Sequence, residues 1–331
     1  MAITLAEAKV GMSDKVVQAV IDTFQRSSLL LDRMTFDDAI SPGTGGSTLT
    51  YGYIQLKTPS QAAVRSINSE YTPGEAKREE KTANAIIMGG SFQVDRVLQN
   101  TSGAIDELSF QAEQKIKATA NYFHNLVING AKASPASGFV AGTFDGLRKL
   151  LDSTSNEFTS ETAITTSAEL SSNGQAFLDE VDKLVAAIDG NCDLLLMNQK
   201  MLLKMRSIAR RAGYYERDKD DFGRVVERFS GIPMMDLGKF YNGIASVDVV
   251  ATSDPTSSAY GMTEIYAVSL GLDGFHGISP SGSKIINAFM PDLSKPGAVK
   301  TGEVELVAGV ALKSTLKAAV LKGIAITPKT P

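Results

Sequence analysis

The longest regular pattern of apolar residues in the chain runs from Thr101 to Gly130. Large apolar residues recur there at steps of three and four, which is the spacing of one face of an α-helix. Ser102 stands where an N-cap hydroxyl belongs, and Asn129–Gly130 offers a left-handed exit. About 27 residues at 1.5 Å each predict a rod of roughly 40 Å, a spine that crosses the molecule. An ordinary core helix of an α+β domain is the alternative. The stripe consists of Ile105, Leu108, Ala112, Ile116, Phe123, Leu126 and Val127.

A shorter apolar stripe lies near the N-terminus. Residues 13–26 predict a helix that is capped by Ser13 and carries Val16, Val20 and Phe24 on one face. This face is too small to hold a fold by itself. We therefore expect the helix to lie in an arm that packs on another subunit or on a scaffold.

Two segments alternate apolar and polar residues and predict a pair of strands, 49–57 and 83–97, with Gly89–Gly90 as a bulge or bend. The 25 or so residues between them are long for a loop in a compact domain. Val64, Ile67 and Tyr71 argue against simple disorder there. A long two-stranded arm is marginal in water, so a neighbouring subunit is the natural surface for it; a solvated loop is the alternative. Its charged residues, our candidate contacts, are Arg65, Glu70, Glu75, Lys77, Arg78, Glu79, Glu80 and Lys81.

The rest of the chain predicts a second lobe of helices and short strands. One helix ends at Asp189–Gly190, residues 192–198 form a short buried strand, and the next helix ends at Gly213. Several further strands follow, and the last 30 residues are strand-like at first.

Composition narrows the class of protein. The chain has 331 residues, 43% of them hydrophobic, and a net charge of −4 without a basic stripe for dedicated nucleic-acid binding. That length favours two domains, or one domain with extensions. A single cysteine, Cys192, excludes a disulfide framework and indicates a reducing cytoplasm. We expect no membrane span and no export by the general route, because the start of the chain does not resemble a signal peptide.

Residues that carry chemistry in enzymes are few and scattered. The only two histidines are His124, expected on the spine helix and partly buried, and His276, expected in a turn. No lysine follows the glycine-rich 41–48 segment in the phosphate-loop position. Ser281–Lys284 and Ser314–Lys317 match the short Ser-x-x-Lys pattern without its companion motifs. We therefore expect no catalytic residue, cofactor or metal; an α+β enzyme with an unrecognised site is the alternative. Asp218, Asp220 and Asp221 are expected to form a solvated loop.

The order of these parts resembles that of a known family. The chain begins with an N-terminal helix and SSLLLDRMTF, which lead into a long charged hairpin and a spine helix. It continues with LLLMN between two helices, the turn Gly231–Ile232–Pro233 and a closing ELVAGVALKSTLKAAVLKGI. The order resembles the major capsid proteins of tailed bacteriophages, whose Hong Kong 97 fold is shared with encapsulin shells. One departure is Lys313–Ser314–Thr315, where the family often has a Pro-x-Ala step.

The resemblance implies an α+β Hong Kong 97-like fold and a division of the chain. Residues 1–48 would form the N-terminal arm and 49–100 the extended hairpin loop, both reaching onto adjacent subunits. Residues 101–165 would form a peripheral domain with the spine helix, 166–295 an axial domain around the capsomer axis, and 296–331 strands that return to the peripheral domain.

The resemblance also implies a function. The chain would be a structural protein that assembles, as hexameric and pentameric capsomers, into the icosahedral head enclosing the double-stranded DNA of a tailed phage. We expect no sequence-specific DNA binding, no membrane, assembly in the host cytoplasm, and a portal protein as partner. The short start of the chain predicts that any scaffolding protein is separate. An encapsulin-type compartment is the alternative within the same fold.

Overall fold

A computed structural model describes most of the chain. The residues that it describes are 29–38, 49–58, 60–95, 97, 107–133, 140–213, 216–219, 225–280, 286–292, 294 and 296–330. The predicted N-terminal helix with Val16, Val20 and Phe24, the first Ser-x-x-Lys segment and Ser102 lie outside these residues.

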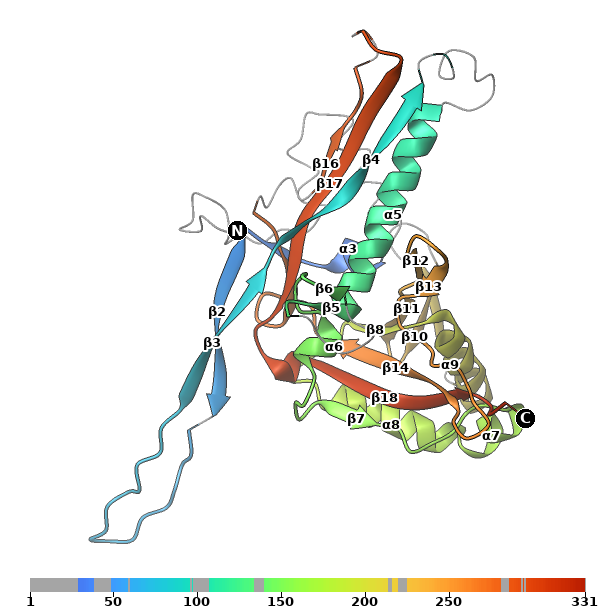
Figure 1. Ribbon diagram of the computed structural model, residues 1–331. Helices are drawn as coiled ribbons and strands as arrows, with labels where there is room; N and C mark the ends of the chain where they lie inside the picture. The colour runs from blue at the N-terminus through green and yellow to red at the C-terminus, as the bar shows by residue number, and fades with distance from the viewer. Residues whose placement is uncertain are drawn as a thin grey trace.

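An upright lobe is built around the spine helix, α5 (Glu107–Asn129). Figure 1 shows α5 alongside the long strands β4 (Ile86–Asp95) and β17 (Val299–Leu312). Ala112, Ile116, Phe123, Leu126 and Val127 are buried on its inner face, so the predicted stripe is confirmed for these residues. Gly130 has no left-handed conformation and instead begins a short strand. The glycine is needed for space, because a Cβ there would lie 2.5 Å from the carbonyl oxygen of Phe144.

The first sheet runs in the order β1-β15-β17-β16, with β4 on β17 as well. Strands β4 and β17 pair antiparallel from Asp95–Val299 to Ile86–Ala308, without interruption at Gly89 or Gly90. Of the two predicted alternatives at Gly89–Gly90, a bulge or a bend, the bulge is therefore wrong. Gly89 has a φ of +151°, and a Cβ there would lie 1.9 Å from the carbonyl oxygen of Val304.

The second lobe contains a seven-stranded sheet in the order β7-β18-β14-β8-β11-β10-β9. Its central strand β8 (Leu194–Met197) is buried on both faces, as its unbroken apolar run predicts. Leu194 and Leu196 belong to the core that contains α5, whereas Leu195 and Met197 belong to a second core with helices α8 (Gly174–Ala186) and α9 (Gln199–Ala212). The sheet therefore separates two cores.

Capping residues bound α9 and begin α7 (Ser167–Ser172), whereas α8 has no side-chain cap and ends at Ala186, before the predicted Asp189–Gly190. Asn198 accepts a hydrogen bond from the backbone of Met201 at the start of α9, and Gly213 ends the helix with a φ of +79°. The short helix α7 has a complete capping box between Thr166 and Glu169.

The remaining elements have the following bounds: α3 Leu29–Arg33, β1 Phe36–Asp37, β2 Thr50–Thr58, β3 Lys77–Asn84, β5 Gly130–Ala131, β6 Val140–Ala141, α6 Leu147–Leu150, β7 Glu157–Thr159, β9 Glu216–Lys219, β10 Val225–Phe229, β11 Ile232–Asp236, β12 Lys239–Tyr241, β13 Ser246–Asp248, β14 Gly261–Val268, β15 Phe275–Ile278, β16 Ile286–Phe289, the 3₁₀ helix η1 Thr315–Lys317 and β18 Ala318–Thr327.

The linear division of the chain does not follow the sheets. β15 and β16, which the sequence places in the segment 166–295, belong to the first sheet. The closing segment 296–331 is shared, because β17 lies in the first sheet and β18 in the second. The chain passes between the lobes several times, so neither lobe is a continuous stretch of sequence.

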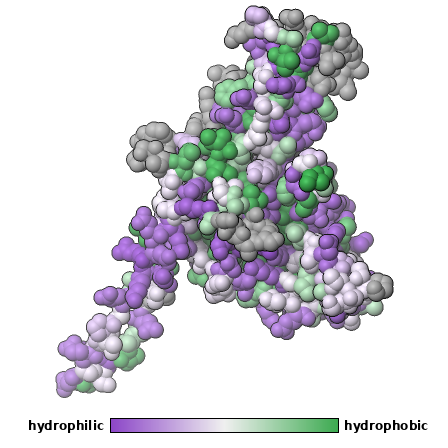
Figure 2. All heavy atoms as spheres, in the orientation of Figure 1, coloured by the Kyte–Doolittle hydropathy of each residue, from purple (hydrophilic) through white to green (hydrophobic). Residues whose placement is uncertain are grey.

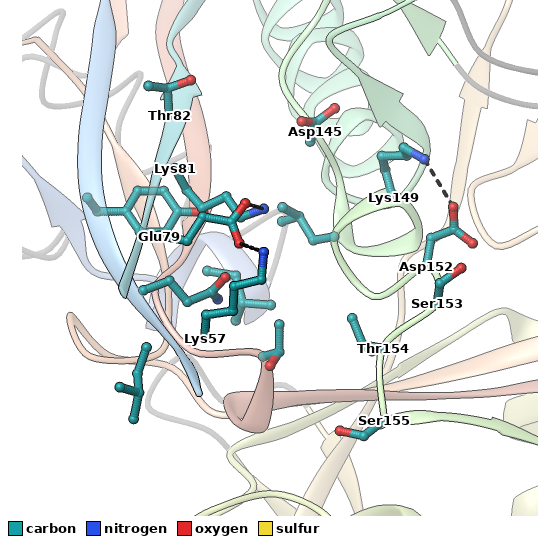
Figure 3. A pocket seen from close by; sticks show the side chains of 16 residues that line it. Lys57, Glu79, Lys81, Thr82, Asp145, Lys149, Asp152, Ser153, Thr154 and Ser155 are labelled. Atoms are coloured by element: carbon teal, nitrogen blue, oxygen red, sulfur yellow. Dashed lines mark hydrogen bonds and ion pairs between the residues drawn. The ribbon is translucent and has the colours of Figure 1, made fainter. Parts of the chain in front are cut away.

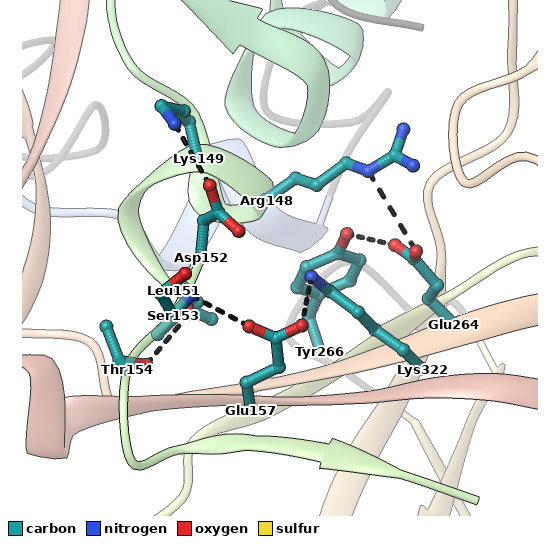
Figure 4. A network of polar contacts seen from close by, with 10 residues as sticks. All are labelled: Arg148, Lys149, Leu151, Asp152, Ser153, Thr154, Glu157, Glu264, Tyr266 and Lys322. Carbon is teal, nitrogen blue, oxygen red and sulfur yellow. Dashed lines mark hydrogen bonds and ion pairs between the residues drawn. The ribbon is translucent and has the colours of Figure 1, made fainter. Parts of the chain in front are cut away.

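A network of polar contacts joins the lobes where α6 meets the second sheet (Figure 4). Arg148 on α6 lies 3.9 Å from Glu264 on β14, and Glu264 also accepts a hydrogen bond from Tyr266. Beside them, the Lys322 ammonium donates to Glu157 at 2.7 Å and holds the pKa of that carboxyl below its usual value. The network ties the base of the upright lobe to β14 and β18.

Candidate functional site

A two-stranded hairpin projects from the body of the molecule (Figure 1). Strand β2 pairs antiparallel with β3, from Thr50–Asn84 to Thr58–Lys77. Lys77 to Lys81 therefore belong to the returning strand; the sequence placed them in the loop between the strands, and that placement is wrong. The segment 86–95, expected to return along 49–57, pairs with β17 instead. The connecting tip is residues 60–76.

The hairpin is anchored to the body by two tyrosines on its inner face. Tyr51 and Tyr53 are buried and stack with ring centroids 5.9 Å apart. The Tyr51 hydroxyl donates to Asp37 at 3.0 Å, and burial raises the pKa of both tyrosines. Lys313 lies over the Tyr51 ring. This base is held by packing and by hydrogen bonds within one subunit.

His276 supports the same base and is not in a turn, contrary to the sequence prediction. It lies on β15, fully buried, and its ring meets that of Tyr51 edge-on at 5.9 Å. Its Nδ1 lies 3.2 Å from the Gly274 carbonyl oxygen, and burial lowers its pKa. These contacts make His276 a packing residue of the hairpin base.

Beyond the base, the hairpin presents apolar side chains to solvent. Ile54 and Leu56 point to the outer face of β2 and are 65% and 59% exposed, opposite Glu80 and Arg78. At the tip, Val64 is fully exposed and Ile67 is 93% exposed. Figure 2 shows that this arm stands away from the body, polar along most of its length with apolar spots towards its end. We call these four residues and Tyr71 the arm surface.

The tip has a defined local structure. Ser69 donates its backbone N–H to the Ser66 carbonyl at 3.2 Å, and Asn68 adopts a φ of +66°, which asparagine tolerates well in turns. The Arg65 guanidinium donates to the Ser69 carbonyl and lies 5.5 Å from the centre of the Tyr71 ring. The tip is therefore a shaped turn that keeps Val64 and Ile67 in water.

The charged residues of the hairpin divide into two groups. Glu79 pairs with Lys81 at 2.9 Å and with Lys57 at 3.4 Å, and these contacts hold its pKa below the usual value. Within the described part of the chain, the other candidate residues form no ion pair; these are Arg65, Glu70, Glu75, Lys77, Arg78 and Glu80. Their charges face solvent in a single subunit.

A groove of about 600 Å³ separates the inner face of the hairpin from the body (Figure 3). Lys57, Glu79 and Lys81 line one wall, and Lys149 and Asp152 line the other. Lys149 and Asp152 pair with each other at 3.0 Å. The groove is polar and bears both signs of charge, so it suits a polypeptide better than a single small anion or cation.

The other residues that the sequence singled out take structural positions. His124 is buried on α5, and Cys192 is half-buried at the edge of the second core, where burial raises its thiol pKa to about 11. Ser314 caps η1, and Asp218 pairs with Arg228 at 3.1 Å.

Two classes of site are not seen in the described residues. No three or more His, Cys, Asp or Glu side chains are arranged there to hold a metal ion. No helix in the same part of the chain is long and apolar enough to cross a membrane.

The sequence missed Ile54 and Leu56 as contact candidates. The signal was present, because Ile54 and Leu56 are large apolar residues on the face of β2 opposite Tyr51 and Tyr53. Such a strand is apolar on both faces, which indicates that the second face is covered too. The charged residues of the segment are more numerous, and the predicted contact residues were therefore all charged.

Comparisons with known proteins point to one family. A family model described as SU10 major capsid protein matches residues 18–233, about two thirds of the chain. No curated protein sequence matches significantly. Among solved structures, the holo-SrpI encapsulin complex from Synechococcus elongatus is similar with a TM-score of 0.57 and 14% identity, covering 99% of this chain and 98% of the other. A chain from Mycobacterium phage Ogopogo is similar with a TM-score of 0.51 and 14% identity, covering 82% and 86%. At this identity the likeness shows the fold, which is Hong Kong 97-like.

Proposed function

The chain belongs to the SU10 major capsid protein family, and from that premise we propose that its hairpin is the arm by which neighbouring copies are joined in the head shell. The protein is a structural protein of a phage capsid. The observation that carries the proposal is the arm surface. Val64, Ile67, Ile54 and Leu56 face water in one subunit, on a projecting element that its own subunit leaves uncovered.

The energetics favour cover by a second copy. Fully burying one large aliphatic side chain contributes about 1.5–3 kcal/mol, so four such residues offer several kcal/mol for each arm. Exposed ion pairs contribute only about 0–1 kcal/mol each. The apolar residues of the arm surface therefore supply most of the affinity. The unpaired Arg78 and Glu80 beside them select the partner surface and the register.

Further partners belong to the proposal. A closed shell made of one chain needs control of its curvature and an opening for its genome, which a separate scaffolding protein and a portal would supply. The N-terminal stripe Val16, Val20 and Phe24 is proposed to contact a neighbouring copy or that scaffold. Assembly would take place in the host cytoplasm, and the shell would enclose DNA without sequence-specific contacts and without catalysis.

The proposal is tested by electron microscopy of the purified protein, expressed alone and with the scaffolding protein of its phage. We expect closed shells of uniform diameter. A protein that stays monomeric under both conditions would contradict the shell function. Particles that enclose a protein cargo and never DNA would instead favour an encapsulin-type compartment.

A further inference from the structure

Helix α9 carries five cations and no acidic residue, but most of these cations are already engaged. Lys204 donates to the Thr165 carbonyl at 2.6 Å, Arg206 pairs with the buried Glu227 at 2.7 Å, and Arg211 donates to the Ser167 carbonyl at 3.0 Å. Lys200 and Arg210 are exposed and make no ion pair with the described residues. Lys200 and Arg210 are therefore the two cations of the helix whose side chains have no such contact within the described residues.

Lys200 and Arg210 share one face of α9 with an exposed leucine. Leu203 is 52% exposed, and positions 200, 203, 207 and 210 fall on the side of the helix opposite the buried Met201, Met205 and Ile208. We call Lys200, Leu203 and Arg210 the basic stripe. An exposed apolar residue flanked by charged ones matches the apolar core and polar rim of a protein–protein contact.

Helix α8 presents the opposite charge. Asp179 and Asp182 are exposed on its outer side, away from the buried Phe177, Val181 and Leu184. Glu161 is exposed, and its backbone N–H donates to Glu180 at 3.1 Å, which places it close to α8. Glu180 itself is engaged by the Ser160 hydroxyl at 2.6 Å. We call Glu161, Asp179 and Asp182 the acidic patch.

The two surfaces lie over different parts of the same sheet. Both helices cover one face of the seven-stranded sheet: α8 contacts β18, and α9 contacts α8 and β18 and reaches to β11, which lies three strands further along. Like charges repel, so neither surface pairs well with its own counterpart on a second copy, whereas the two opposite surfaces can pair between copies. They match a head-to-tail contact, the type that closes into rings.

We propose that the basic stripe of one copy docks on the acidic patch of the next copy, so that α8 and α9 form a head-to-tail contact around each capsomer. This proposal rests on the shell function and adds a second contact, distinct from the arm. Opposite charge steers the copies into this orientation, and Leu203 becomes buried in the contact. Repulsion excludes a contact between two basic stripes. A two-fold contact in which each stripe meets the other copy's acidic patch would give dimers in place of rings, and such dimers would overturn the head-to-tail orientation.

Nucleic acid is the weaker occupant for the basic stripe. Affinity for a phosphate backbone grows with the number of cations that can reach it, and two cations beside a leucine supply little. The complementary acidic patch on the same lobe has no role in binding DNA. A second copy accounts for both surfaces.

The test is a charge swap in the full chain. Lys200→Glu with Arg210→Glu should raise the subunit concentration needed for half-assembly at least about tenfold, with unchanged circular dichroism because both side chains are on the surface. Adding Asp179→Lys and Asp182→Lys to that variant should restore most of the assembly. Lys183→Glu is the control for sign: it also replaces a cation by an acid, but next to the acidic patch, so it should not weaken assembly.

The outcomes separate this proposal from the shell function. If the unmodified chain forms no particles, the shell function fails. If the unmodified chain forms particles, two results would each refute the head-to-tail contact. One is normal assembly of the Lys200→Glu, Arg210→Glu variant, and the other is no recovery of assembly when Asp179→Lys and Asp182→Lys are added to it. If the Lys200→Glu, Arg210→Glu variant forms normal shells that retain less DNA, the basic stripe contacts the genome and not a second copy.

Discussion

At the scale of single residues, His124 gives the subunit a sensitivity to acid. Burial of its ring on α5 lowers its pKa from the ordinary 6.5 to about 4. The unfolded chain takes up the proton near pH 6.5, whereas the folded chain stays neutral until about pH 4. The contribution of neutral His124 to the free energy of unfolding is present above pH 6.5 and is lost as the pH falls towards 4. We expect the free energy of unfolding to fall by about 3 kcal/mol between pH 6.5 and 4.

Urea unfolding of dissociated subunits at several pH values measures this loss. His124→Gln should flatten the dependence over this range even if it lowers stability at pH 7. His276→Gln is the matched variant; it should leave most of the dependence in place. An unchanged slope in the His124 variant would contradict the account of this residue.

The two adjacent glycines of β4 make a second prediction at this scale. A Cβ at Gly89 would meet the backbone of Val304, whereas one at Gly90 would meet the flexible end of Lys115 at 3.3 Å. Gly89→Ala should therefore cost at least about 2 kcal/mol, because the ladder to β17 must shift, and Gly90→Ala less than about 1 kcal/mol. Thermal unfolding of the two variants measures the difference. Equal losses would show that the close approach of β4 to β17 is wrong.

Single residues were also where the sequence was hardest to interpret. His276 lies among glycines, and glycine-rich segments usually turn. Here Gly277 is required inside a strand, because a Cβ would lie 2.4 Å from the ring of Phe36. A glycine that makes room for an aromatic ring from a distant segment cannot be distinguished from a turn glycine without the tertiary structure.

At the scale of elements, the tip of the hairpin should differ between free and assembled subunits. Residues 60–76 are exposed throughout in one subunit, and Arg65 is the trypsin site among them. Brief trypsin treatment should cut the free subunit after Arg65. In assembled shells the same bond should be protected, because a neighbouring copy covers the tip. Mass spectrometry of the fragments measures the cleavage rate in each state. Equal rates in free and assembled subunits would argue against the arm as a contact.

The elements with a local pattern were predictable, and those with distant partners were not. The stripe of α5, the two-sided burial of β8 and the end of α9 at Gly213 follow from residues close in sequence. Strand β3 consists of charged and polar residues such as Arg78 and Glu80, so no apolar alternation marks it. The pairing of β4 with β17 joins segments about 200 residues apart, and nothing local specifies that partner.

At the scale of the whole molecule, small contacts gain weight through repetition. Each subunit offers the arm surface at one end and the opposed charges of α8 and α9 on the other lobe. Neither surface is needed to fold one subunit, since the cores lie between α5 and the first sheet and on the two sides of β8. A closed shell repeats every such contact, so a loss too small to matter in a dimer decides whether a shell forms.

The central claim is that the arm joins subunits and does not hold one subunit together. Sedimentation velocity on a variant in which residues 61–75 are replaced by a short Gly/Ser turn tests it most directly, since strands β2 and β3 and the tyrosine base are kept. The account predicts a folded protein with native circular dichroism that sediments as free subunits or small oligomers under conditions where the unmodified chain forms shells. Closed shells of normal size and yield from this variant would contradict it.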